Sequence, residues 1–342
     1  PRCCSKDGFA SRPQRAGGDR HCIPRIGSFR RLGQQLCRWW TDSGHEKVVQ
    51  TFSNQALNTL VNYGVRSFAS SADNFFMTES RSDLLEFSAG SFADRAEVRV
   101  ADARGEVGRA DVWITDPPYA DAIVYHELSE FFLAWYEKHL PRLFPDWNPD
   151  SRRRALAIQG SGKAFREAMV ATYSNLAARM PDDGMQIVMF THSDAGVWAD
   201  LALILWAAGL RVTAAWTVAT ETPSGNKSGS NYVQGTVLMV LRKRQGEDMA
   251  FLDELVPQVE TEVQAQLDAM LALDDADDPN FSDADYQLAA YAAALRVLTA
   301  YANIEDVDVA YELARERTDR DESPIVRIIQ DAVRIASNYL VP

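Results

Sequence analysis

Four consecutive residues, Asp116-Pro117-Pro118-Tyr119, combine groups that suit the binding of an amino group. Each proline fixes φ at about −65° and lacks an N–H, so the turn is rigid and its carbonyls cannot pair as they would in a sheet. The Asp116 carboxylate and the Pro117 carbonyl are both acceptors, and together they match the N–H donors of an –NH2 group. Tyr119 adds an aromatic face on which a nucleic-acid base could stack. The alternative interpretation is a strand-ending turn with a packed tyrosine.

The elements around this tetrapeptide indicate an α/β fold. An apolar run predicts a buried strand over 112–115, and a short strand is predicted over 98–100. Strands and helices then alternate, which favours a mostly parallel sheet covered on both faces. The last two strands are joined without a helix, which places an antiparallel strand inside the sheet or at its edge. Helices are predicted over 123–139, 163–179 and 196–208, and further strands over 185–190, 211–220 and 233–241.

The two ends of the chain differ in composition from this α/β core, which we assign to 95–244. Residues 1–28 are rich in Arg, Gly and Cys without apolar periodicity, so we expect a disordered or non-native segment. Apolar positions at three- and four-residue steps over 29–69 predict a helical region that extends over 29–94. An acidic helical region follows over 245–342. Its predicted helices cover 250–272, 283–301 and 325–339.

The formal net charge of −13 comes from the C-terminal region. Residues 245–342 hold 22 acidic and 6 basic side chains, which leaves 29 basic and 26 acidic side chains before them. Phosphate contacts need a local positive patch rather than a basic chain, so the charge does not exclude a nucleic-acid partner. The alternative for each basic cluster is a solvated surface. The clusters are Arg152-Arg153-Arg154, Lys163 with Arg166, and Arg242-Lys243-Arg244.

Other classes of protein are disfavoured by the composition. No window approaches the roughly 20 apolar residues of a membrane span, and no signal peptide opens the chain. We therefore expect a soluble, cytoplasmic protein. The cysteines, Cys3, Cys4, Cys22 and Cys37, form no C-x-x-C pair, so no metal site is predicted.

Several blocks of the sequence resemble class I amino-methyltransferases that bind S-adenosylmethionine. Within this class the chain resembles bacterial adenine-specific DNA methylases of the group that often carries a zinc ribbon, and the resemblance covers roughly residues 30–340. It implies a Rossmann-like methyltransferase sheet, mostly parallel with a closing antiparallel strand, and a helical C-terminal extension. The matching blocks are Leu36-Cys37-Arg38-Trp39, 50–57, 115–119 with 128–132, Phe190-Thr191-His192 followed by Trp198, 209–213 and 285–301.

The resemblance implies methyl transfer from S-adenosylmethionine to the N6 amino group of adenine in DNA. The base would be flipped out of the duplex, stacked on Tyr119 and bound through N6 by Asp116 and the Pro117 carbonyl, with Pro118 completing the turn. Restriction or phage-defence proteins are the further partners expected. The same motif serves N4-cytosine and guanine-N2 methylation of DNA or RNA, so these reactions stay open. A non-catalytic fragment that only binds nucleic acid or a partner chain is the remaining alternative.

The sequence lacks a clear copy of the loop that holds the methyl donor in this family. Such enzymes use a strand that ends in an F-x-G-x-G-like loop before the tetrapeptide. Residues 87–91 come nearest but lack the second glycine and a following helix. The resemblance therefore implies an N-terminally truncated methyltransferase that could be inactive in isolation.

Four further residues are candidates for binding. Asp102 ends a predicted strand, where it would lie near the adenine of the cofactor or form a plain turn. Tyr125 would line the pocket or begin a helix. His192 follows a buried strand at the sheet edge where ligands collect, with a structural hydrogen-bonded histidine as the alternative. Lys227, in the Gly/Ser/Asn-rich loop 225–231, would contact DNA or lie in an ordinary hairpin loop.

Overall fold

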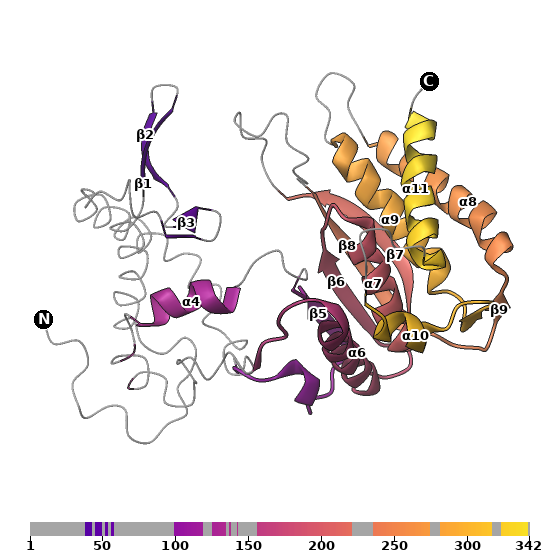
Figure 1. The fold of residues 1–342 in the computed structure, drawn as a ribbon, viewed down its shortest axis with the longest axis horizontal. Coiled ribbons are helices and arrows are strands. Elements are labelled where there is room, and N and C mark those ends of the chain that lie inside the picture. Colours follow the sequence, from indigo (N-terminus) through magenta and orange to yellow (C-terminus); the bar gives the residue numbers. More distant parts are fainter. Residues whose placement is uncertain are drawn as a thin grey trace, which may run out of the picture. The chain divides into compact units, whose positions relative to one another are not determined.

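The structure, a computed structural model, is described here for part of the chain (Figure 1). The chain divides into two compact units, the first over 1–100 with 124–153 and the second over 101–123 with 154–342. The residues described are 38–42, 45–49, 52–53, 56–57, 99–118, 125–134, 137, 142, 156–220, 235–273, 281–316 and 323–340.

Short antiparallel strand pairs occur in the described part of the first unit. Strand β1 (Arg38–Asp42) pairs with β2 (His45–Val49), and β3 (Phe52–Ser53) pairs with β4 (Ala56–Leu57). The helix predicted over 29–69 is therefore wrong for these residues. The paired ends of β1 and β2 are separated in sequence by Ser-Gly, a turn-forming dipeptide. Aromatic and β-branched residues on both sides of it suit strands, and this signal outweighs the apolar spacing.

The first unit also contains helix α4 (Tyr125–Ala134), which confirms the central part of the helix predicted over 123–139. Its sequence runs from Tyr-His-Glu into apolar residues, and Glu127 in the first turn suits the positive end of the helix dipole. Residues 1–28 lie outside the described residues.

The second unit is built on a four-stranded mixed sheet in the order β5-β6-β8-β7. Strand β5 (Val112–Thr115) runs parallel to β6 (Met185–Phe190), while β8 (Gly235–Lys243) is antiparallel to both β6 and β7 (Leu210–Ala219). The α/β class is confirmed. Three of the four described strands in this sheet, β5, β6 and β7, run in the same direction, and β8 runs opposite to its two neighbours. The strand predicted over 98–100 is wrong for residues 99–100, which are followed by the 3₁₀ turn η2 (Ala103–Gly105).

Helices cover one face of this sheet (Figure 1). Helix α6 (Gly162–Ala178) places the Tyr173 hydroxyl 3.3 Å from the Thr115 hydroxyl of β5. Helix α7 (Ala195–Ala207) packs Trp198 edge-on against Phe190 of β6, with ring centroids 5.0 Å apart. The same Trp198 stacks at 5.4 Å on Tyr291 of α9 (Asp283–Leu298). Because the two strand residues share one face, α6, α7 and α9 lie on that face.

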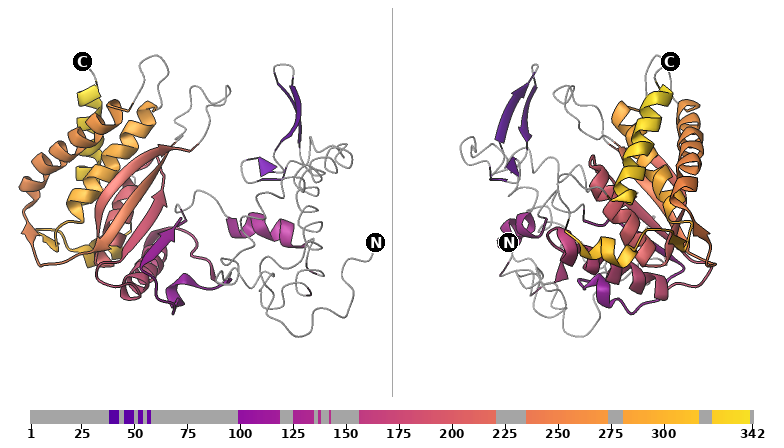
Figure 2. Two further views of the ribbon diagram at one scale, coloured as in Figure 1. Left: turned by 180° about the vertical axis from the view of Figure 1, so that it is seen from behind. Right: turned by 45° about the vertical axis from the view of Figure 1, so that its right-hand side comes forward.

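The opposite face carries no helix from the described part of the chain (Figure 2, left). It is nevertheless apolar, because Ile114 is paired with Ile187, Ile187 with Val240, and Leu238 with Trp216. Ile114 is 67% exposed and Trp216 is 55% exposed. The prediction of a sheet covered on both faces is wrong for these residues, since burial alternates along β6 and β8 instead of being continuous. Val112, Met185, Met189 and Val218 belong to the same face.

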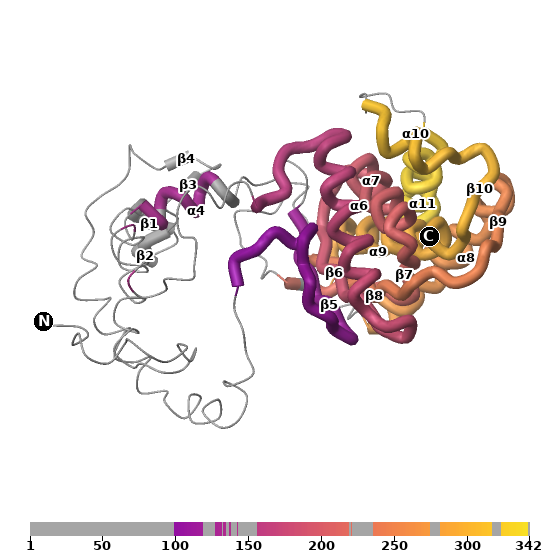
Figure 3. Tube along the Cα trace, turned by 90° about the horizontal axis from the view of Figure 1, so that it is seen from below, coloured from indigo at the N-terminus to yellow at the C-terminus, as the bar shows by residue number. Residues whose placement is uncertain are grey.

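The C-terminal helices are packed into this unit, and α9 contacts both strand β7 and helix α7 (Figure 3). Helices α8 (Leu252–Leu271), α9 and α11 (Pro324–Leu340) confirm the three predicted helices to within a few residues. Helix α10 (Val309–Ala314) and the parallel pair β9 (Met249–Ala250) with β10 (Asn303–Ile304) were not expected from the sequence.

Two side chains from the C-terminal region close the outer edge of β7. The Thr299 hydroxyl accepts the backbone N–H of Val212 at 2.9 Å, and the Gln266 amide donates to the Ala215 carbonyl at 2.9 Å. Side chains therefore satisfy backbone groups that an edge strand leaves unpaired.

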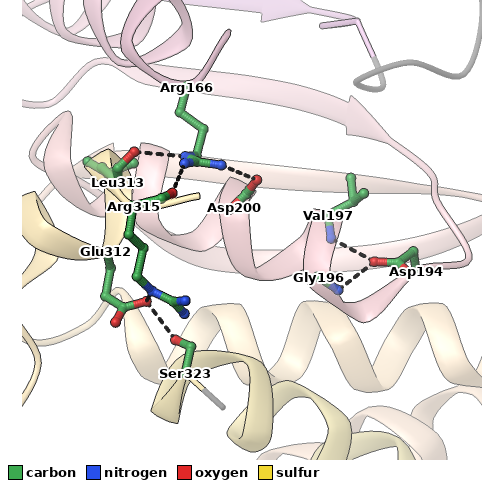
Figure 4. Close-up of polar contacts among 9 residues, drawn as sticks. All are labelled: Arg166, Asp194, Gly196, Val197, Asp200, Glu312, Leu313, Arg315 and Ser323. Atoms are coloured by element: carbon green, nitrogen blue, oxygen red, sulfur yellow. Dashed lines mark hydrogen bonds and ion pairs between the residues drawn. The ribbon is translucent and has the colours of Figure 1, made fainter. Parts of the chain in front are cut away.

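Arg166 joins α6 to two other helices from a fully buried position (Figure 4). Its Nη1 lies 3.2 Å from Asp200 Oδ2 on α7, its Nε donates to the Leu313 carbonyl at 2.9 Å, and its Nη2 donates to the Arg315 carbonyl. The sequence left two interpretations open for Lys163 with Arg166, a phosphate contact or a solvated surface, and the buried Arg166 fits neither of them. The buried guanidinium fills its donor sites with protein oxygens instead.

Candidate functional site

Asp116, Pro117 and Pro118 follow directly after β5. Asp116 is exposed, Pro117 is buried and Pro118 is half-buried. The ladder between β5 and β6 ends with Thr115 opposite Val188, and the prolines have no N–H with which to continue it. The turn is thus anchored at Pro117, while the carboxylate before it reaches solvent. Tyr119 lies outside the described residues, so its role as a stacking surface stays a prediction.

Tyr173 of α6 contacts the end of β5 on the face of the sheet that the helices cover. Its side chain is almost fully buried, and its hydroxyl lies 3.3 Å from the Thr115 hydroxyl, one residue before Asp116. Burial raises the pKa of Tyr173 to about 12, and the negative charge of Asp116 acts in the same direction. The phenol therefore stays protonated at neutral pH. Tyr173 was not identified from the sequence. The signal that could have pointed to it is its position on the apolar face of the predicted helix.

His192 follows β6 and is half-buried. The backbone N–H of Asp194 donates to its Nδ1 at 3.0 Å, and its own carbonyl accepts from Trp198 Nε1 at 2.8 Å. Burial lowers the pKa of His192, although the nearby Asp194 charge opposes this effect. The imidazole is therefore held mainly neutral and in a fixed position. The backbone of His192 has the structural role that the sequence allowed, and binding by its ring stays a prediction.

The structure brings Asp116, Pro117 and His192 to one edge of the sheet. Strands β5 and β6 are parallel, so the residues that follow them lie at the same carboxyl edge, where ligands bind in open α/β sheets. The start of β8 meets this edge as well, because Thr191 Oγ1 donates to the Gly235 carbonyl at 2.9 Å. A carboxylate, a rigid turn and an imidazole thus lie on adjacent strand ends.

Asp102 forms the plain turn that the sequence left open as the alternative to a contact with S-adenosylmethionine. Its carboxylate caps η2 by accepting from the Arg104 backbone N–H, and it forms an ion pair with the Arg104 guanidinium at 2.6 Å. The hydrogen bond with that side chain is the main cause that lowers the pKa of Asp102. The carboxylate is therefore committed to its own turn. The glycine-poor segment 87–91 lies outside the described residues, so the part of the chain described here does not identify a cofactor site.

Two further candidates stay predictions. Tyr125 is the first residue of α4 in the first unit. Lys227, with the loop around it, lies outside the described residues.

The basic cluster Arg242-Lys243-Arg244 lies at the end of the sheet opposite Asp116. Strand β8 runs over nine residues from the carboxyl edge to this cluster, a length of about 27 Å. Lys243 Nζ lies 2.9 Å from Asp182 Oδ1, Arg242 donates to the carbonyls of residues 183–184, and Arg244 donates to the Trp206 carbonyl. These side chains bind the turn before β6 and the end of α7, so the structure gives the cluster protein partners in place of the phosphate contact or the solvated surface that the sequence left open. Arg152-Arg153-Arg154 lies outside the described residues.

No group of three or more metal-ligating side chains occurs in the described part of the chain. None of the helices described there is long and apolar enough to cross a membrane.

Comparison of this chain with models of protein families, with curated protein sequences and with solved structures gives no match.

Proposed function

We propose that this protein transfers a methyl group from S-adenosylmethionine to the exocyclic N6 amino group of adenine in DNA. One observation carries the proposal: an exposed Asp116 carboxylate and a buried Pro117 follow β5, and His192 follows the parallel strand β6 at the same edge of the sheet. The antiparallel β8 inside the sheet is compatible with a Rossmann-like methyltransferase core, which is the fold we propose.

The proposed chemistry follows from the acceptor groups of the turn. The Asp116 carboxylate and the Pro117 carbonyl would accept the two N–H bonds of the target amino group. Those bonds would draw the nitrogen toward tetrahedral geometry, so that its lone pair could displace the thioether sulfur of the donor from the methyl carbon. The methylated amino group would then lose one proton to solvent. The rigid turn holds the acceptors in place before the base arrives, and such positioning can supply a large part of a rate enhancement. No contact of the methyl donor is assigned to the described residues.

The proposed substrate is an adenine that has been flipped out of the duplex, which costs a few kcal/mol of unstacking. Tyr119 would provide its stacking surface. The DNA backbone would be bound by groups other than Arg166 and the cluster 242–244, since those cations already bind protein oxygens.

The test is identification of the methylated product. The full chain is incubated with S-adenosylmethionine and unmethylated DNA, the DNA is digested to nucleosides, and these are analysed by mass spectrometry. We expect N6-methyladenine from the wild type and none from Asp116→Ala. Asp182→Ala, which removes an exposed carboxylate at the opposite end of the sheet, should leave the yield unchanged.

Three results would contradict the proposal. N4-methylcytosine or N2-methylguanine would change the target base and keep the reaction class. Absence of every methylated nucleoside would favour a non-catalytic protein that only binds nucleic acid or a partner. An equal yield of N6-methyladenine from the wild type and Asp116→Ala would show that the Asp116 carboxylate takes no part in the reaction.

A further inference from the structure

The hydrogen bonds of His192 fix which of its ring nitrogens carries the proton. A neutral imidazole has one N–H donor and one bare acceptor nitrogen. The backbone N–H of Asp194 can only donate, and it points at Nδ1 from 3.0 Å. Nδ1 is therefore the acceptor, and the proton is on Nε2. No partner of Nε2 occurs in the described part of the chain, and this atom is not among the buried polar atoms without a partner.

The loop that carries the His192 ring is held in place by contacts with two helices. Asp194 is fixed as the cap of α7, because its Oδ1 accepts from the backbone N–H groups of Gly196 at 2.7 Å and Val197 at 3.1 Å (Figure 4). The backbone carbonyl of the neighbouring residue Ser193 accepts a hydrogen bond from the Tyr291 hydroxyl of α9 at 3.2 Å. The loop is thus held from α7 and from α9. A fixed loop presents a hydrogen-bond donor at Nε2 with little loss of conformational entropy on binding.

We propose that His192 is a specificity-determining residue whose Nε2–H donates to a ring nitrogen of the base held at Asp116. The inference rests on the proposed function and adds to it a donor that complements the acceptors of the proline turn. Adenine suits this pair, since it has a ring-nitrogen acceptor on each side of the amino group, N1 on one side and N7 on the other. Guanine offers such an acceptor on only one side of its amino group, at N3, because N1 on the other side carries a proton and would repel the donor.

The test compares bases that lack one group at a time. Single-stranded oligonucleotides of thymines carry one central adenine, 7-deazaadenine, 1-deazaadenine or purine, and their affinity for the full chain is measured by fluorescence anisotropy. We expect adenine to bind on the order of tenfold more tightly than one of the two deaza analogues, which corresponds to one lost hydrogen bond. The analogue that loses affinity tells whether N7 or N1 accepts the bond.

Two variants connect the effect to the side chain. His192→Phe should bind adenine and both deaza analogues equally, whereas His192→Gln, which retains an N–H donor, should keep part of the difference. Thermal unfolding of both variants checks that they fold. Equal wild-type affinity for adenine and both analogues would overturn the inference, and so would undiminished discrimination by a folded His192→Phe.

The purine oligonucleotide separates this inference from the proposed function. Purine lacks the amino group that Asp116 is proposed to bind. If the wild type binds adenine more tightly than purine but binds both deaza analogues as tightly as adenine, only the proposed role of His192 fails. If it does not distinguish adenine from purine, the proposed amino-binding site fails and the inference falls with it.

Discussion

The two faces of the four-stranded sheet differ in what covers them. On one face Trp198 is fully buried between Phe190 and Tyr291. On the other face Trp216 is 55% exposed, although its neighbours are also apolar. Since the same strands supply both faces, the difference lies in the helices, which the described part of the chain places on one face only. We infer that the covered face provides most of the packing energy of the second unit, and that it holds the strand ends of the candidate site in place.

The largest effect should come from the two tryptophans that represent the two faces. Trp198→Ala removes a fully buried side chain and its hydrogen bond to the His192 carbonyl, so it should lower the free energy of unfolding by about 3–5 kcal/mol. Trp216→Ala removes a half-exposed ring and should cost about 1 kcal/mol or less. Urea denaturation of the full chain followed by circular dichroism measures both values. Similar losses from the two variants would contradict the inferred difference between the faces.

The next largest effect should appear when two basic side chains of α6 are compared. Arg166 is buried among the helices of the covered face, and Lys163 is exposed to solvent. Arg166→Met leaves the Leu313 and Arg315 carbonyls without their buried donor, and we expect a loss of about 3 kcal/mol. Lys163→Met removes an exposed side chain that pairs with Glu167 at 3.7 Å, and little change is expected. The same denaturation experiment applies. A small effect of Arg166→Met would show that α10 and α7 are not joined through this side chain.

A pH-dependent effect should follow from Tyr173, which lies beneath the site. Its pKa is raised to about 12 in the folded state, against about 10 in the unfolded chain. Below pH 10 both states keep the proton, so the stabilisation is fully present. Between pH 10 and 12 the unfolded state loses its proton first, and stability should fall by up to about 2.7 kcal/mol.

The control for this effect is Tyr173→Phe. It should lack this part of the decline above pH 10 when the unfolding free energy is measured over pH 8–11.5. A wild type and a variant with the same slope would indicate that the phenol is not buried as described.

The smallest effect concerns the protected edge of β7. Thr299→Val removes the hydroxyl that accepts the Val212 N–H in a buried position, and it should cost about 1–3 kcal/mol because a donor is left unsatisfied. Thr261→Val on α8 removes an exposed hydroxyl that donates to the Pro257 carbonyl of its own helix and serves as the matched control. Hydrogen exchange of the Val212 amide, faster in Thr299→Val and unchanged in Thr261→Val, would locate the effect. Unchanged exchange in both would exclude this protection.

The sequence predicted the second unit better than the first. Met185–Phe190 is a strand over its predicted bounds, because a short apolar run between a Pro-Asp-Asp-Gly turn and a polar segment has few other solutions. Helix α7 ends before Gly209, whose φ of 72° suits the residue that terminates a helix. These signals are local, so they can be recognised without knowledge of the packing.

The errors concern long-range structure. Alternating and continuous burial look alike in a strand such as Val237–Leu241, where both faces are apolar, so the open face could not be recognised. Arg166 and Arg242 resembled surface cations because their partners are backbone carbonyls far along the chain. For the site, the turn at Asp116 and the position of His192 were predicted. The Tyr173–Thr115 contact and the tautomer of His192 depend on tertiary packing that no spacing reveals.

The central claim is that the carboxyl end of β5 binds the amino group, and two aspartates flank this strand. Asp116 follows it at the proposed site, and Asp111 precedes it with an exposed side chain. The most direct measurement is the rate of methyl transfer to adenine-containing DNA by the wild type, Asp116→Asn and Asp111→Asn. We predict a loss on the order of 100-fold or more for Asp116→Asn and a rate within about twofold of the wild type for Asp111→Asn. Equal rates for the two variants would contradict the account.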